Sequence, residues 1–150
     1  MVKVVHNLTF QVPASRLFAA LFDYEHSYRW QTIEVLKEWR DPEDGPIKVG
    51  TRVYQKRIFN GKPIESLNII TAFEQDRRVV AQNPATRVEY QVAPLGEHEA
   101  RLDFSINLKI KGIAALFGPL IGRGLQKDVV ERFQNLKRYL EYGESCRRSW

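Results

Sequence analysis

Hydrophobic and polar residues alternate along the first twelve positions of the chain. A period of two is typical of a strand with one buried face. One face of the expected strand, residues 2–12, carries Val4, Leu8, Phe10 and Val12, joined by His6. The segment is therefore predicted to be a β-strand whose apolar face lies on the core.

The pattern then changes to the period of a helix. Pro13 can occupy the first position of a short helix, where a missing N–H has no cost. The apolar stripe of that helix is Leu17, Phe18, Leu21 and Phe22. Residues 23–30 predict a second short helix or turn that is rich in aromatic side chains.

Near the end of the chain, apolar residues recur at steps of four, four, three and four: Leu125, Val129, Phe133, Leu136 and Leu140. This stripe predicts one amphipathic helix of about twenty residues that ends at Gly143. Asp128 and Arg132 have the spacing of an i,i+4 ion pair, and we expect them on the outer side of the helix.

Strand patterns fill the middle of the chain, at residues 33–39, 51–59, 62–73, 77–82, 87–94 and 100–110. Asn60-Gly61 is a strong hairpin signal, and residues 96–98 predict a three-residue hairpin loop. Strands joined by hairpins form an antiparallel sheet, so the fold class is α+β. We expect a single domain, residues 1–150, with about seven strands curved round the long C-terminal helix and two short helices after strand one. Such a sheet closes imperfectly over one helix, which predicts a cavity.

Composition narrows the functional classes. Lys and Arg total 23 against 18 Asp and Glu, for a net charge of +5, and the basic residues are scattered, which argues against nucleic-acid binding. No run of about 18 apolar residues exists, so no membrane span is expected. The N-terminus lacks the apolar region of a signal peptide, and the one cysteine, Cys146, fits a reducing, cytoplasmic location. Three histidines and one thiol argue against a zinc site, and no glycine motif for a nucleotide is present, so neither a metal nor a cofactor is expected.

Several segments, taken in order, resemble the polyketide cyclase/dehydrase-like branch of the START-like (SRPBCC, helix-grip) superfamily. They are residues 10–18 (FQVPASRLF) with Phe22-Asp23 and Trp30, residues 49–51 (VGT), residues 70–79 (ITAFEQDRRV) and residues 136–141 (LKRYLE). Gln75-Asp76 stand where proline is usual in the family. The resemblance implies a helix-grip fold with a hydrophobic pocket under the long helix. It does not imply a reaction, because members range from lipid carriers to cyclases.

Strand parity predicts which side chains face the pocket. On the last strand the even positions are apolar, Phe104 among them, and the preceding strand then turns Val88, Tyr90 and Val92 inward. The Asn60-Gly61 hairpin leaves the choice of face open, and we favour the face with Gln55, Arg57, Ser66 and Asn68. The expected ligand-binding residues are Trp30, Gln55, Arg57, Ser66, Asn68, Tyr90, Phe104, Phe117, Val129 and Phe133.

The sequence offers few residues that could catalyse a reaction or anchor a ligand. Arg57 either lies at the pocket mouth with its head in water or anchors an acidic head group. His6 is either a core histidine or a pocket base, and it is the one weak catalytic candidate. His26 and His98 are expected at the surface, and no serine lies in a nucleophile elbow.

Three functions are compatible with this pattern. The first is binding or carriage of a hydrophobic small molecule such as a lipid, polyketide or aromatic compound. The alternative is a cyclase, dehydratase or hydrolase that uses the same pocket, with His6 or Arg57 acting on the substrate. The third is a protein-interaction module. Binding is favoured because the sequence offers no positioned acid/base pair, while the ligand and a monomeric or homodimeric state stay open.

The segment 111–124 crosses one end of the expected cavity. It holds four of the nine glycines, Pro119, and apolar residues that include Phe117. It is either a rigid apolar cap that completes the core or a mobile gate to the pocket.

Overall fold

The computed structural model describes residues 1–59 and 61–145. Asn60 and Cys146, which the sequence singles out, lie outside the described residues. The strands are β1 (Val2–Phe10), β2 (Val35–Asp41), β3 (Arg52–Phe59), β4 (Lys62–Glu74), β5 (Arg78–Gln82), β6 (Thr86–Gly96) and β7 (Glu99–Leu108). The helices are α1 (Ala14–Leu21), α2 (Gly118–Tyr142) and the 3-10 helices η1 (Ser27–Arg29) and η2 (Gly112–Phe117).

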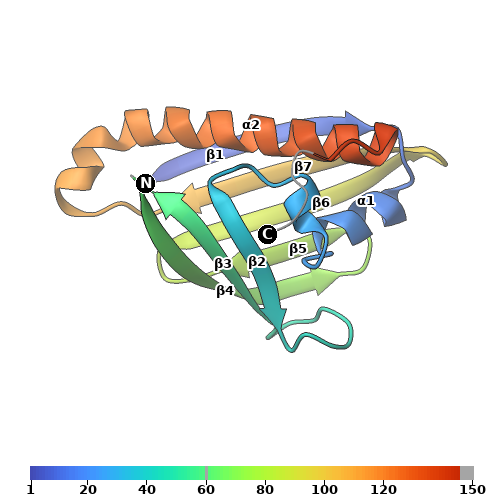
Figure 1. Ribbon diagram of the computed structural model, residues 1–150, viewed down its shortest axis with the longest axis horizontal. Coiled ribbons are helices and arrows are strands. Elements are labelled where there is room, and N and C mark those ends of the chain that lie inside the picture. Colours follow the sequence, from blue (N-terminus) through green and yellow to red (C-terminus); the bar gives the residue numbers. More distant parts are fainter. Residues whose placement is uncertain (60, 146–150) are drawn as a thin grey trace.

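The described strands form one antiparallel sheet in the order β1-β7-β6-β5-β4-β3-β2. Neighbours in the chain are neighbours in the sheet, except for β1, which pairs with β7. Figure 1 shows the curvature: α2 runs along β1, while β2, β3 and β4 curl round beneath it. The predicted α+β helix-grip architecture is confirmed.

The core lies between β1, β7, α1 and the second half of α2. Phe133 is fully buried at its centre, where its ring lies 4.9 Å from that of Phe104 and 6.4 Å from that of Trp30. Of the predicted helix stripe, Val129, Phe133, Leu136 and Leu140 are buried, and Leu125 is half-buried. Each such side chain contributes about 1.5–3 kcal/mol through removal of apolar surface from water. The second half of α2 is thus the main core element.

Helix α2 has 25 residues and begins at Gly118, well before the apolar stripe that predicts it. Pro119 lies in its first turn, where the missing N–H costs nothing. Gly143 ends the helix as expected, with a left-handed φ of 72° and its amide directed to carbonyls of the last turn. Pro13 is the N-cap of α1, so its predicted place as the first helical residue is wrong by one position.

Two hairpins decide which side chains face inward. Phe59 pairs with Lys62, and Lys56 pairs with Glu65, which is the register predicted from the sequence. The predicted three-residue loop at 96–98 is wrong, because Gly96 pairs with Glu99. The loop is one residue shorter than predicted, but a bulge between Pro94 and Gly96 inserts one extra residue into β6. The two changes cancel, so the predicted inward face of β6 is unchanged.

One strand boundary differs from the expectation. Strand β2 begins at Val35, and Ile33, expected to start it, is 72% exposed. The predicted short helix or turn at residues 23–30 is present as a turn followed by the 3-10 helix η1. None of the described helices is both long and apolar enough to cross a membrane.

Candidate functional site

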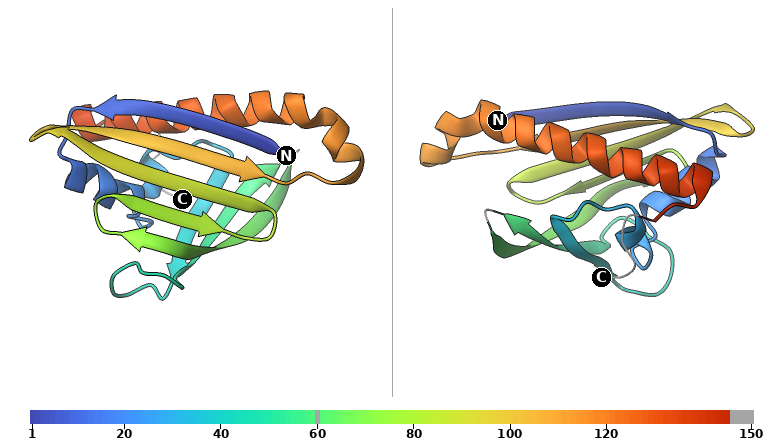
Figure 2. Two further views of the ribbon diagram at one scale, coloured as in Figure 1. Left: turned by 180° about the vertical axis from the view of Figure 1, so that it is seen from behind. Right: turned by 45° about the horizontal axis from the view of Figure 1, so that its top comes forward.

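A cavity of about 1040 Å³ lies between the sheet and the first half of α2. Its walls come from the inner faces of β2 to β7, from η2 and from α2. Figure 2 shows how these elements are arranged in space. The apolar part of the lining includes Val53, Ile70, Ala81, Val88, Phe104, Ile106, Leu108, Ile121, Leu125 and Val129. The cavity exists because α2 packs on β1 and leaves the middle strands uncovered.

Most of the residues predicted to bind a ligand line this cavity: Gln55, Arg57, Ser66, Asn68, Tyr90, Phe104, Phe117 and Val129. The favoured face of the β3–β4 hairpin is the one that faces the cavity. Trp30 and Phe133 lie instead in the core, where their rings stack on each other. Contact of any of these residues with a ligand stays a prediction.

His6 lies outside the cavity lining. Its ring stacks on Phe133, with 6.3 Å between centroids, on the inner face of β1. Burial lowers the pKa of His6, and its Nε2 has no hydrogen-bond partner among the described residues. Its position is that of a core histidine beside α2.

A carboxyl group that the sequence analysis did not identify, Glu38, lies in the cavity wall. The amide of Gln55 donates a 2.9 Å hydrogen bond to its Oε2, and the amide of Gln31 reaches Oε1 at 3.4 Å. Burial raises the pKa of Glu38 to about 7, although these amides and the charge of Arg132 act in the opposite direction. A bulge between Val35 and Lys37 turns Glu38 inward, so simple alternation along β2 does not reveal it.

Helix α2 contributes a buried ion pair to the same cavity. Arg132 Nη2 lies 2.7 Å from Asp128 Oδ2, and the side chains are only 9% and 12% exposed. The predicted pair therefore exists, but its predicted place on the outer side of the helix is wrong. The reason is that α2 buries a wider arc than its apolar stripe, with one side on β1 and the other on the cavity. Asp128 Oδ1 and Arg132 Nε have no partner among the described residues.

Arg57 extends from β3 into the cavity without an ion-pair partner among the described residues. Its buried Nε makes no hydrogen bond there. Burial, and next the charge of Arg132, lower the pKa of Arg57, whereas Asp128 and Glu34 act the other way. The cavity thus contains a guanidinium whose charge the protein compensates only in part.

Two tyrosines, Tyr24 and Tyr90, also line the cavity. Together with Glu38, Arg57 and the Asp128–Arg132 pair they make up what we call the polar end of the cavity. Burial, and next the charge of Glu38, raise the pKa of both Tyr24 and Tyr90. The ring of Tyr90 packs edge-on against Phe22 and Phe104, at 5.3 and 5.2 Å. Asn68, by contrast, is already bonded, because it accepts a 3.0 Å hydrogen bond from Asn83. Glu38, the two tyrosines and the two arginines therefore form a cluster of polar side chains in the cavity wall.

The chain matches the family model described as polyketide cyclase / dehydrase and lipid transport over residues 1–141. It belongs to this family. The resemblance found in the sequence is thereby confirmed, and the cavity with its polar end is this family member's candidate site. No curated protein matches the sequence.

Solved structures agree on the fold of this polyketide cyclase and lipid-transport family member. TTHA0849 from Thermus thermophilus is 16% identical, with a TM-score of 0.75 over 95% of this chain and 99% of that one. The di-domain ARO/CYC BexL of the BE-7585A biosynthetic pathway is 14% identical, with a TM-score of 0.70 over 94% of this chain and 47% of its own. A START superfamily protein from Mycobacterium smegmatis is 12% identical, with a TM-score of 0.66 over 92% and 98%. These similarities show the START-like fold.

Among the residues that the structure describes, no group of possible metal ligands lies in the cavity wall. Among the described residues, Asp23, Glu25 and His26 are near enough to one another to hold an ion, and they do not line the cavity. Asp23 and His26 are already bonded, with 2.9 Å between Oδ2 and Nδ1.

Proposed function

We propose that the protein binds a hydrophobic small molecule, of the lipid, polyketide or aromatic class, in the cavity under α2. The observation that carries the proposal is the cavity, whose volume of about 1040 Å³ and largely apolar walls fit such a ligand. The family description, which joins polyketide cyclases with lipid transport, supports the same class of ligand.

The polar end supports a ligand with an acidic or oxygen-bearing head group. Arg57 is largely buried, and its Nε makes no bond among the described residues. The Nε of Arg132 is free in the same way. A carboxylate placed between these groups would gain charge-assisted hydrogen bonds that water cannot supply inside the cavity. The head group would lie near Arg57, with the apolar part along β5 to β7.

Native mass spectrometry of gently purified protein tests whether a ligand co-purifies. A binding comparison then tests the head group: a long-chain fatty acid and its methyl ester are titrated against wild type and Arg57→Met. We expect wild type to prefer the acid by about tenfold or more and Arg57→Met to lose the preference. Arg52→Met is the matched control, because Arg52 is exposed on the same strand. Equal affinities throughout would remove the anchor. Absence of a co-purified ligand, together with no binding of either compound, would contradict the proposed function.

A second candidate, a cyclase or dehydratase-type enzyme, rests on Glu38. A carboxyl group with a pKa of about 7 in a cavity is suited to proton transfer near neutral pH. Its carboxylate would take a proton from a carbon next to a ligand carbonyl. The guanidinium of Arg57 or Arg132 would stabilise the negative oxygen of the resulting enolate, and the proton would return to the product.

Proton exchange distinguishes the two candidates. A cavity-binding β-diketone is incubated in deuterated buffer, and exchange at its central carbon is followed by NMR. The enzyme candidate expects wild type to accelerate exchange and Glu38→Gln to lose about a hundredfold or more, with binding affinity retained. Binding without acceleration by wild type contradicts the enzyme and leaves the carrier.

A further inference from the structure

The connection between β7 and α2 exposes an unusual group of apolar side chains. We call residues 112–120 the tip; it comprises η2 and the first turn of α2. Leu116, Phe117 and Leu120 are 80%, 54% and 66% exposed. Single exposed apolar residues are common on protein surfaces, but three within five positions form a patch that calls for a partner.

The tip projects beyond the sheet. In Figure 1 it forms the outermost part of the molecule at the end where α2 begins, and both views of Figure 2 place it at the same extreme. A narrow projection offers too little surface for a stable protein interface, which buries about 800 Å² on each partner. The shape of the tip is better suited to insertion into a lipid bilayer.

Charge around the tip has one sign. From Phe104 to Lys127 the sequence contains four basic residues, Lys109, Lys111, Arg123 and Lys127, and no acidic residue. All four are exposed, two on each side of the tip in the sequence. The next acidic residue, Asp128, is largely buried in its pair with Arg132. Apolar side chains flanked by Lys and Arg match the layering of a bilayer, in which acyl chains lie beneath anionic headgroups.

We propose that the tip docks the protein onto an anionic lipid surface, with Leu116, Phe117 and Leu120 inserted and the four flanking cations at headgroup level. Docking would also connect the membrane to the cavity, because Phe117, Leu120 and Lys127 are among the exposed residues of the cavity lining. This connection between membrane and cavity rests on the proposed function, whereas the docking itself does not.

Vesicle flotation tests the docking. Wild type is mixed with vesicles of phosphatidylcholine alone or of phosphatidylcholine with phosphatidylglycerol, with no other ligand present. We expect binding to the anionic vesicles only, and release at high salt. Replacing Leu116, Phe117 and Leu120 together by serine is expected to weaken binding by about tenfold or more. The control replaces the exposed Ile33 and Leu95, which lie outside the tip, by serine and is expected to bind as wild type.

A charge-matched pair of variants separates local from global charge. Replacing Lys109, Lys111, Arg123 and Lys127 by glutamine is expected to weaken anionic-vesicle binding by at least about a hundredfold. The control replaces four exposed basic residues elsewhere, Lys37, Lys48, Arg52 and Arg138, for the same change in net charge. Equal loss in both variants would overturn the proposal, because net charge alone would then explain binding.

Two other outcomes would also overturn it. Wild type that fails to bind anionic vesicles contradicts it directly. Self-association that the serine variant abolishes, without vesicle binding, would show that a second copy of the chain covers the tip. The proposed function fails separately: a protein that binds vesicles but neither the fatty acid nor its ester would keep its docking surface and lose its proposed cargo.

Discussion

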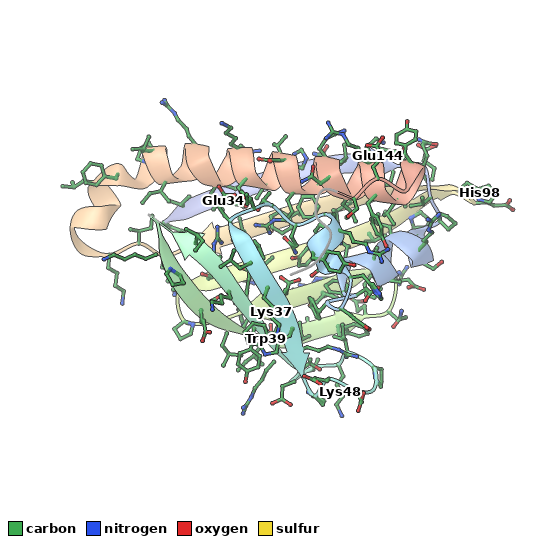
Figure 3. The ribbon with its side chains drawn as sticks, viewed as in Figure 1. Glu34, Lys37, Trp39, Lys48, His98 and Glu144 are labelled. Carbon is green, nitrogen blue, oxygen red and sulfur yellow. The ribbon has the colours of Figure 1, made fainter. Side chains whose placement is uncertain are left out.

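Gln55 on β3 and Glu38 on β2 are register partners, and the amide of Gln55 donates a 2.9 Å hydrogen bond to Oε2 of Glu38. This bond favours the charged carboxylate, yet burial has the larger effect and raises the pKa of Glu38 to about 7. The neighbours therefore fix where the carboxyl group points, while burial decides its charge. Figure 3 labels Glu34, a cavity-lining residue just before β2, and Lys37, an exposed residue on β2.

Glu38 should make stability depend on pH in a defined direction. Its pKa rises from an ordinary 4.5 to about 7 in the folded protein. Between these values the folded state holds more protons than the unfolded state, so wild-type stability falls as pH rises through this window and stays reduced above it. Glu38→Gln has no carboxyl group to titrate. Its unfolding free energy relative to wild type should therefore rise across the window, by up to about 3 kcal/mol.

Urea unfolding of both proteins at the two ends of the window measures this difference. Glu65→Gln is the control, because Glu65 is exposed on β4 opposite Lys56. An equal stability difference between Glu38→Gln and wild type at both pH values would contradict the burial of Glu38.

The Asp128–Arg132 pair should behave as a buried pair. Asp128→Asn leaves the guanidinium of Arg132 buried without its carboxylate and should cost about 3 kcal/mol of unfolding free energy. Replacing both residues, by Asp128→Leu and Arg132→Met, should restore most of the stability. Denaturant unfolding of Asp128→Leu, of Arg132→Met and of the double variant provides the coupling energy.

The exposed ion pair between Arg101 and Asp103 is the control for the buried pair. Arg101 Nη2 lies 3.1 Å from Asp103 Oδ1, and the two side chains are 48% and 43% exposed. Asp103→Asn should cost only a few tenths of a kcal/mol. A similarly small loss for Asp128→Asn would place that pair in solvent.

Two adjacent residues of α2 test how the helix packs. Val129 is fully buried and Val130 is 41% exposed. Val129→Asp buries an unpaired carboxylate and should cost several kcal/mol, which lowers Tm by about 10 °C. Phe133→Asp should do the same, and Val130→Asp should melt close to wild type. If Val129→Asp or Phe133→Asp melted within about two degrees of wild type, α2 would not be the core element described.

Hydrogen exchange tests whether the segment 113–124 is a gate or a cap. A gate opens locally at a lower free energy than the sheet, so its amides should exchange much faster than those of residues 102–110. Addition of a cavity ligand should slow them. Protection equal to that of β7 in the ligand-free protein would identify a rigid cap.

The elements with the most regular patterns could be predicted from the sequence. Strict alternation on β7 and the apolar stripe of α2 predict both elements, because each repeats apolar residues at the period of its own secondary structure. The Asn60-Gly61 motif predicted the register of β3 and β4 but left open which face lines the cavity, and the favoured face, with Gln55 and Arg57, is the one that does. Loop length was less predictable, as the bulge at Leu95 shows.

The polar end of the cavity could not be predicted in the same way. A bulge reverses the face of β2 between Val35 and Glu38, and no residue type marks it. Asp128 and Arg132 have the spacing of a solvated pair, and only the uncovered middle of the sheet shows that they face a cavity. Apolar periodicity identifies the side chains that are buried in the core. It does not show whether a polar side chain faces solvent or an internal cavity.

The pairing of β1 with β7 has a consequence for how the chain acquires its structure. Val2 pairs with Leu108 and Phe10 with Ala100, so β1 has no strand partner until about a hundred residues more have been synthesised. Strands β2 to β7 can pair with neighbours as they emerge, whereas β1 must wait for β7 and then receive α2. Contacts of such long sequence separation slow folding. Until then the apolar face of β1 is exposed, and this is the interval in which the nascent chain is most prone to aggregation.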